Sequence, residues 1–143
     1  MTDFSTSPRR ETILLVDDNE LVLKVVAAML SRAGFRVLSA ASGFDALKLA
    51  EQTDGNIELL LSDVDMPAMS GLDLGEALKK IRPETRVMLM SGGDYGTPAV
   101  LSFGWAYIQK PFAARKLIQM ITDILQSRDG GRSGGPEPSR CGP

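Results

Sequence analysis

The amino-acid sequence predicts an α/β protein in which helices cover both faces of a parallel β-sheet. Between residues 12 and 127, short runs of aliphatic and β-branched residues alternate with segments whose apolar residues recur at helical spacing. This alternation is typical of βαβ units. The chain has 143 residues, of which 43% are hydrophobic, so it is long enough to bury a core without disulfides or a structural metal. We therefore expect a single domain.

Five short runs of aliphatic and β-branched residues are expected to form the strands of this sheet. Each run has the length of a buried strand, and each is followed by polar or turn-forming residues. The runs are residues 13–17, 36–39, 59–63, 86–90 and 106–109.

Two helices begin with the same capping signature. Ser42 and Ser70 are each followed three residues later by an aspartate, so a serine oxygen and an acidic side chain can satisfy free N–H groups of the first turn. We expect the second and third helices to begin there. Their inward-facing residues are expected to be Leu47, Ala50, Leu74, Leu78 and Ile81.

The other helices are predicted from apolar spacing. The first ends at Gly34, a residue type common at helix C-termini, the fifth starts from Phe112, and a short fourth is predicted within residues 97–103. The apolar stripe of the first helix consists of Val22, Val25, Val26, Met29, Leu30 and Ala33. That of the fifth consists of Leu117, Met120, Ile121, Ile124 and Leu125.

The two ends of the chain differ in composition from its centre. Residues 1–10 are polar and charged, and residues 128–143 are rich in Gly, Pro and Ser, so we expect a flexible N-terminal arm and a disordered tail around a domain at 11–127. No apolar run approaches the ~18 residues of a membrane span, which predicts a soluble, cytoplasmic protein without membrane contact. Met1 is followed at once by the domain, and this favours a stand-alone protein.

The composition excludes several classes of chemistry. The chain contains no histidine and one cysteine, Cys141, which excludes Ser-His-Asp catalysis, histidine metal ligands and an internal disulfide. Residues 11–127 carry 11 basic and 15 acidic side chains, a net charge of −4, which argues against direct nucleic-acid binding. Any reaction must therefore use carboxylates, hydroxyls and lysine.

Polar residues stand at the ends of four predicted strands: Asp17 and Asp18, then Asp63, Ser91 and Lys110. Each has an ordinary structural explanation, as an acidic helix start, a cap, a turn residue or a solvated lysine. In an open parallel sheet, however, the carboxyl ends of the strands meet at one edge, where ligands bind. We therefore expect these side chains to form one site.

The charges at this edge predict a bound cation. Three aspartates bring a charge of −3, which like-charge repulsion opposes, and a divalent cation together with Lys110 would neutralise it. Carboxylate and carbonyl oxygens suit Mg²⁺, which also accepts phosphate oxygens. One carboxylate can then act as a nucleophile toward phosphorus.

Taken in order, these residues resemble a known family. Asp17-Asp18, Leu-Leu-Leu-Ser-Asp63-Val-Asp-Met-Pro-Ala-Met-Ser-Gly71, Met-Ser91-Gly and Lys110-Pro-Phe are similar to the receiver domain of bacterial two-component response regulators. The similarity covers about residues 11–127. It implies a doubly wound, flavodoxin-like sheet of five parallel strands in the order 2-1-3-4-5, flanked by five helices. It also implies a cis bond between Lys110 and Pro111.

The resemblance assigns a role to each residue at this edge. It implies that Asp63 is the phosphoacceptor and that Ser91 and Lys110 contact the phosphoryl group. It implies that Asp17, Asp18 and Asp63 bind Mg²⁺ together with the main-chain carbonyl of Asp65, with Asp18 as the more direct ligand.

Tyr107, three residues before Lys110, matches the aromatic switch position of the family. The resemblance implies that phosphorylation pulls Ser91 inward and that the ring follows. The alternative is a half-buried strand tyrosine that packs against the last helix. Trp105 is expected either to mark a partner-binding face or to pack in the core. Nineteen positions separate Ser91 from Lys110, about one helical turn fewer than the family pattern, so the fourth helix and the signalling face are expected to be unusual.

The sequence thus favours a phosphoacceptor signalling module rather than an enzyme with turnover. It would receive a phosphoryl group from a sensor histidine kinase or phosphotransfer protein and signal to a downstream effector protein, with homodimerisation on phosphorylation as an option. Because the chain has no histidine, its kinase must be a separate protein. Two alternatives stay open: a haloacid-dehalogenase-like phosphohydrolase that uses Asp63 and Asp65, and a receiver-derived scaffold cut from a hybrid kinase.

Overall fold

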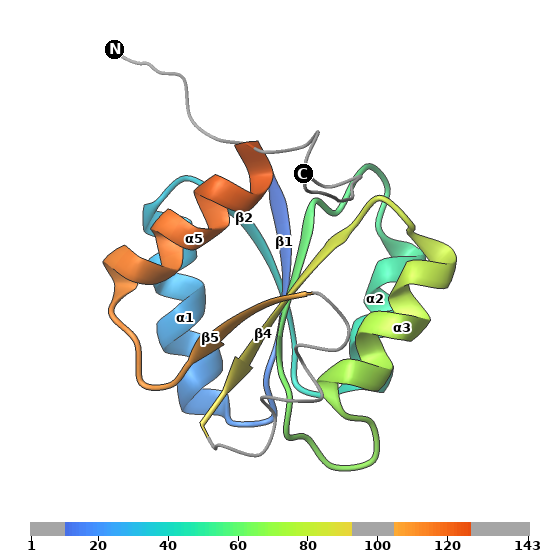
Figure 1. Ribbon diagram of the computed structural model, residues 1–143. Helices are drawn as coiled ribbons and strands as arrows, with labels where there is room; N and C mark the ends of the chain where they lie inside the picture. Colours follow the sequence, from blue (N-terminus) through green and yellow to red (C-terminus); the bar gives the residue numbers. More distant parts are fainter. Residues whose placement is uncertain (1–10, 93–104, 127–143) are drawn as a thin grey trace, which may run out of the picture. The chain divides into compact units, whose positions relative to one another are not determined.

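The structure, a computed structural model, describes residues 11–92 and 105–126 (Figure 1). Its strands are β1 (Thr12–Val16), β2 (Arg36–Ala40), β3 (Leu59–Asp63), β4 (Arg86–Ser91) and β5 (Ala106–Gln109). Its helices are α1 (Glu20–Arg32), α2 (Gly43–Gln52), α3 (Gly71–Ile81) and α5 (Ala114–Gln126). All five predicted strands are present, within one residue of the expected ends. The fourth helix, expected within residues 97–103, and the segments 1–10 and 128–143 lie outside the described residues.

The strands form one parallel sheet in the order β2-β1-β3-β4-β5, which confirms the doubly wound topology. The register is continuous across the sheet: Leu14 of β1 lies opposite Leu38 and Leu60, and Leu89 of β4 lies opposite Ser62 and Tyr107. The strand order reverses between β1 and β3, and this is the point at which open α/β sheets bind ligands.

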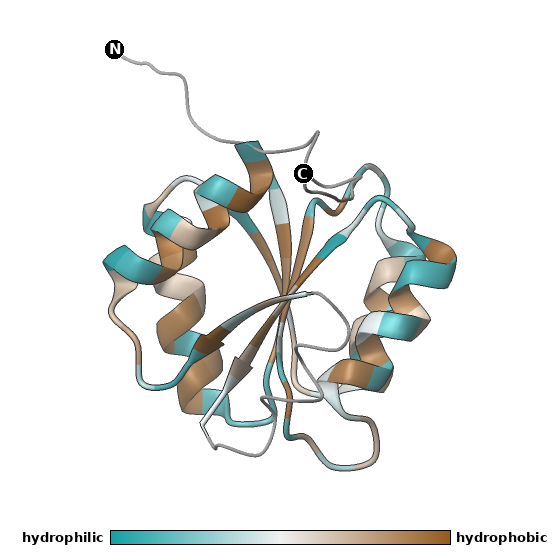
Figure 2. Ribbon diagram, in the orientation of Figure 1, coloured by the Kyte–Doolittle hydropathy of each residue, from teal (hydrophilic) through white to brown (hydrophobic). Residues whose placement is uncertain are grey.

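The strands β1, β3 and β4 are apolar on both faces and almost completely buried, whereas the edge strands β2 and β5 are partly exposed (Figure 2). Leu14 and Val16 of β1 belong to a buried cluster with residues of α2 and α3. The alternate residues Ile13 and Leu15 are also buried and point to the opposite face. There α1 lies, while α2 and α3 lie side by side on the first face (Figure 1).

The helix α5 belongs to a second compact unit that begins at Ala113, whereas the sheet and α1, α2 and α3 lie in the unit that ends at Phe112. It begins at Ala114, two residues later than the sequence suggested. Its buried residues, Leu117 and Ile121, are one turn apart on the predicted stripe. None of the described helices is long and apolar enough to cross a membrane.

The predicted capping residues are confirmed. The Ser42 and Ser70 hydroxyls accept hydrogen bonds from the main-chain N–H groups of Asp45 and Asp73, both at 3.1 Å. The first helix stops before Gly34, whose φ of 98° is a backbone conformation that favours glycine.

Two residues that were expected to face the sheet are exposed instead. Val25 of α1 and Ile81 of α3 are each 47% exposed. Val25 lies about 100° round the helix from the buried Val26 and about 140° from the buried Leu30, so it falls outside the stripe. Ile81 is the last residue of α3, beyond the part of that helix that covers the core.

Candidate functional site

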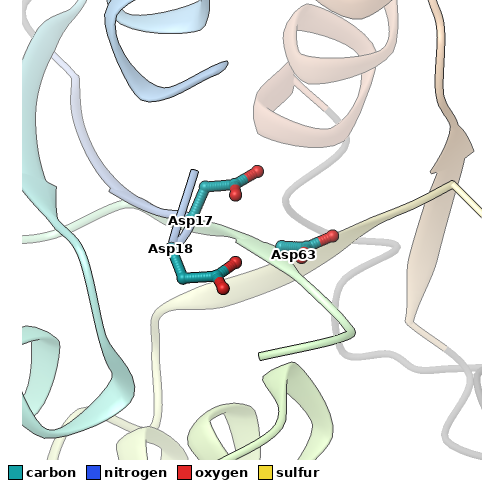
Figure 3. Close-up of side chains that lie close together, drawn as sticks. All are labelled: Asp17, Asp18 and Asp63. Atoms are coloured by element: carbon teal, nitrogen blue, oxygen red, sulfur yellow. The ribbon is translucent and has the colours of Figure 1, made fainter. Parts of the chain in front are cut away.

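Three aspartates meet at the carboxyl ends of the neighbouring strands β1 and β3 (Figure 3). Asp17 and Asp18 follow β1 directly, and Asp63 is the last residue of β3. One carboxylate oxygen from each lies within 4.8 Å of the others. Asp17 and Asp63 are buried, with 1% and 6% of their surface exposed, while Asp18 is exposed. The three side chains therefore form one acidic cluster that is exposed on the Asp18 side, and this cluster is called the acidic pocket.

Lys110 supplies the positive charge at this pocket. It follows β5, and its N–H donates to the Ser91 carbonyl at the end of β4, at 2.7 Å. Its Nζ lies 2.9 Å from Asp17 Oδ2 and 3.1 Å from Asp63 Oδ1. The peptide bond between Lys110 and Pro111 is cis, as the resemblance implied. One ammonium group is thus shared by two buried carboxylates.

Both oxygens of Asp17 have partners. Oδ2 pairs with Lys110, and Oδ1 accepts a hydrogen bond from the Asn19 N–H at 2.9 Å. Asn19 in turn caps α1, because its side-chain oxygen accepts from the N–H groups of Leu21 and Val22 at 3.0 and 3.2 Å. Asp17 is therefore fixed in orientation by the start of α1.

The environment shifts two ionisable groups in the pocket. Burial raises the pKa of the Asp63 carboxyl above its usual value; Lys110 opposes this shift, and the charges of Asp17 and Asp18 add to it. Burial by itself lowers the pKa of the Lys110 ammonium, but its hydrogen bonds to Asp17 and Asp63 outweigh burial, and the pKa is raised. The Asp63 carboxyl is thus harder to ionise than a free aspartate, chiefly because it is buried.

The donor set of this pocket fits a divalent cation. With all three carboxyls ionised and Lys110 protonated, the pocket has a charge of −2, and its donors are oxygens within 4.8 Å of one another. Hard oxygen donors and an uncompensated charge of this size match Mg²⁺.

The other predicted site residues lie around this cluster. Ser91 is the last residue of β4 and is buried, and its carbonyl is joined to Lys110 as described. Asp65 is exposed on the loop after β3, and the role of its carbonyl as a ligand stays a prediction. Tyr107 is half-buried and packs, like Trp105, against the core cluster on the side of α2 and α3.

Sequence reasoning missed two residues that shape the site. Asn19 is not among the predicted site residues, although an Asn directly before a helix is a cap signal that the sequence offers. Ser62 was passed over as a strand residue, yet its hydroxyl donates to the Asp63 carbonyl at 2.9 Å. A single serine after the aliphatic run Leu59-Leu60-Leu61 was the signal.

The chain is similar to known proteins over most of its length. A family model described as response regulator receiver domain matches residues 13–122. The chain is 33% identical to Sensor kinase CckA of Brucella abortus, with 90% of this chain and 14% of that protein covered. It is 36% identical to Transcriptional regulatory protein CpxR of Escherichia coli, with 80% and 49% covered. The chain thus spans about half or less of the length of these relatives.

The chain is also similar to solved structures of receiver domains. A response regulator receiver domain protein (CheY-like) from Methanospirillum hungatei is 28% identical, with a TM-score of 0.76, and the similarity covers 86% of this chain and 99% of that one.

Proposed function

This chain belongs to the response regulator receiver domain family, and from that premise we propose that Asp63 accepts a phosphoryl group from the phosphohistidine of a sensor histidine kinase or phosphotransfer protein. The observation that carries the proposal is the placement of Asp63 among two further carboxylates and Lys110 at the point where the strand order reverses.

The transfer requires a nucleophilic carboxylate. A carboxylate oxygen of Asp63 attacks phosphorus, a P–O bond forms, and the P–N bond breaks with its electron pair leaving on the donor imidazole, which takes up a proton. The product is an acyl phosphate on Asp63. Lys110, 3.1 Å from Asp63 Oδ1, favours the ionised carboxylate before transfer and stabilises charge on the phosphoryl oxygens during it.

The transfer is proposed to depend on Mg²⁺. Asp18, Asp17 and Asp63, with the main-chain carbonyl of Asp65, would hold the ion, with Asp18 as the more direct ligand because both oxygens of Asp17 already have partners. When bound, the ion would neutralise charge on the phosphoryl group. The same residues would serve the later hydrolysis of the acyl phosphate, so the chain would catalyse both its own phosphorylation and its dephosphorylation.

Ser91 and Tyr107 are proposed to transmit the phosphorylated state. Ser91 is the last residue of β4, the strand that pairs with β3 and Asp63. Tyr107, on the neighbouring strand β5, lies opposite Leu89 of β4. A hydroxyl drawn toward a phosphoryl oxygen would leave space for the half-buried ring of Tyr107. The changed surface would then be recognised by an effector protein.

The phosphohydrolase alternative is not favoured, because the family match covers residues 13–122 and includes both the Asp17-Asp18 pair and Lys110. A receiver-derived scaffold that is never phosphorylated would require a site residue to be missing, and Asp17, Asp18, Asp63 and Lys110 are all in place.

Phosphorylation is tested by incubating the chain with Mg²⁺ and a small acyl phosphate, and then measuring the intact mass. We expect one added phosphoryl group in the wild type, none without Mg²⁺ and none in the Asp63→Asn variant, which keeps the side-chain shape. A phosphoryl group that persists in Asp63→Asn would refute the proposal. Sustained turnover of a phosphate ester, lost in Asp65→Asn, would revive the hydrolase.

A further inference from the structure

Three hydrogen bonds hold the main chain directly after the Asp63 Cα atom. The buried Ser62 hydroxyl donates to the Asp63 carbonyl oxygen at 2.9 Å. The Val64 N–H donates to the Met90 carbonyl of β4, and the Val64 carbonyl accepts from the Gly71 N–H, both at 2.9 Å. The peptide groups that follow Asp63 are therefore held in place by hydrogen bonds to residues of β3, of β4 and of the first turn of α3.

Gly71 lies directly against this segment. A Cβ atom at position 71 would overlap the carbonyl oxygen of Asp63 and would lie 3.0 Å from its carbonyl carbon and from Val64 Cα. These are backbone atoms of a buried strand end, so they have little freedom to move away. The absence of a side chain at Gly71 is what allows the first turn of α3 to approach the Asp63 main chain.

We propose that Ser62 and Gly71 are positioning residues for phosphoryl transfer, which hold the Asp63 main chain so that its carboxylate points at Lys110 and the incoming phosphorus. The inference rests on the proposed function of Asp63. The direction of the Asp63 side chain is set at its Cα, which the clamped carbonyl adjoins. A displacement of about 1 Å at a reacting group is enough to lower a rate by ~10²-fold.

Two matched controls separate positioning from stability. Gly75 lies one turn further along α3, and a Cβ there would lie 2.6 Å from the Trp105 indole rather than near Asp63. Thr85 is a buried hydroxyl residue like Ser62, and its Oγ1 donates to the Ile57 carbonyl at 2.7 Å, just before the start of β4. The variants Gly75→Ala and Thr85→Val therefore disturb similar packing and a similar hydrogen bond away from the site.

The experiment compares Ser62→Ala and Gly71→Ala with these controls in the full chain. The rate of phosphorylation by a small acyl phosphate is followed by intact mass at saturating Mg²⁺ over a range of donor concentrations. All measurements are made at a temperature where circular dichroism shows each variant to be folded.

We expect the maximal rate constant to fall about 10-fold in Ser62→Ala and about 10²-fold in Gly71→Ala. The donor concentration for half-maximal rate should change little, because the donor-binding groups stay in place. Gly75→Ala and Thr85→Val should lower the thermal midpoint and keep the wild-type rate constant.

Wild-type rates in folded Ser62→Ala and Gly71→Ala would overturn the inference while leaving the proposed function intact. An equal loss of rate in the two controls would also overturn it, because the effect would then be general. If Gly71→Ala does not fold, the nearly isosteric Ser62→Ala decides alone. Absence of phosphorylation in the wild type would instead contradict the proposed function.

Discussion

We predict that the side chain of Arg82 makes the main stabilising interaction between the end of α3 and the end of α2. Its Nε and Nη2 donate to the Ala50 carbonyl at 3.2 and 3.0 Å, Nη2 also donates to the Thr53 carbonyl at 2.7 Å, and Nη1 to the Gly55 carbonyl at 2.8 Å. Ala50 is in the last turn of α2 and Thr53 is its C-cap residue, where carbonyl groups lack partners within the helix. One guanidinium thus satisfies three carbonyls.

The perturbation is Arg82→Met, which keeps much of the aliphatic stem and removes every donor. The three carbonyls are partly exposed, and water replaces part of the lost bonding, so we assign about 1 kcal/mol to each and a total of ~3 kcal/mol. For a domain of this size, that corresponds to a fall in the thermal midpoint of about 12 °C. The free energy of unfolding of Arg82→Lys should lie between those of the wild type and Arg82→Met, because a lysine ammonium group cannot donate to all three carbonyls at once as the planar guanidinium does.

The assay is urea unfolding followed by far-UV circular dichroism, with Lys80→Met as the control. Lys80 is exposed on the same helix and its loss changes the net charge equally, so its effect should stay within about 0.5 kcal/mol. Phosphorylation of Asp63 should be unaffected, because α2 ends near the amino ends of the strands, whereas Asp63 lies at the carboxyl end of β3 (Figure 1). Equal free energies of unfolding for Arg82→Met and Lys80→Met would refute the reasoning.

Three further predictions concern the pocket and the loop beside it. Mg²⁺ at about 100 times its dissociation constant should stabilise the wild type by about 2.7 kcal/mol in thermal unfolding, and a similar shift in Asp18→Asn would contradict the assigned ligand. Because the folded-state pKa of Asp63 is raised, its contribution to stability is present at pH values below its unfolded pKa and is lost as the pH rises through the folded one. In urea unfolding without divalent cations, the free energy of unfolding should therefore depend less on pH in Asp63→Asn than in the wild type. Parallel pH profiles for the two proteins would count against a raised pKa of Asp63. Ala68 has a φ of 70°, so Ala68→Gly should raise the free energy of unfolding by roughly 1 kcal/mol, whereas Ala77→Gly within α3 should lower it by about as much; a loss in both would show that Ala68 is unstrained.

The strands and helices were predictable because their signals are local, whereas the strand order followed from the family resemblance. The aliphatic runs marked every strand, and Ser42 and Ser70 marked two helix starts, since a cap needs only its own turn to form. The side-chain cluster was predictable for a different reason: the carboxyl ends of parallel strands must share an edge, so Asp17, Asp63 and Lys110 converge once the strands are assigned.

What the sequence did not reveal depends on contacts between distant segments. The spacing of Ile81 fits the inward stripe of α3, and its exposure follows only from where that helix ends relative to the core. The approach of Gly71 to the Asp63 carbonyl joins residues on different elements, and the three acceptors of Arg82 lie about 30 positions away in the chain. Such contacts produce no periodic pattern in the sequence, so they cannot be predicted from it.

The candidate site combines a rigidly held main chain with charges that are not balanced by the protein itself. Lys110 pairs with Asp17 and Asp63, yet a third carboxylate, Asp18, stands close enough to raise the pKa of Asp63. The chain could lower this repulsion by replacing Asp18 with a neutral residue, with no evident loss of packing because Asp18 is exposed. The Asp18 charge disfavours ionisation of Asp63 in the free protein, and a bound cation would relieve this repulsion. The excess negative charge is therefore best explained as part of the function and not of the fold.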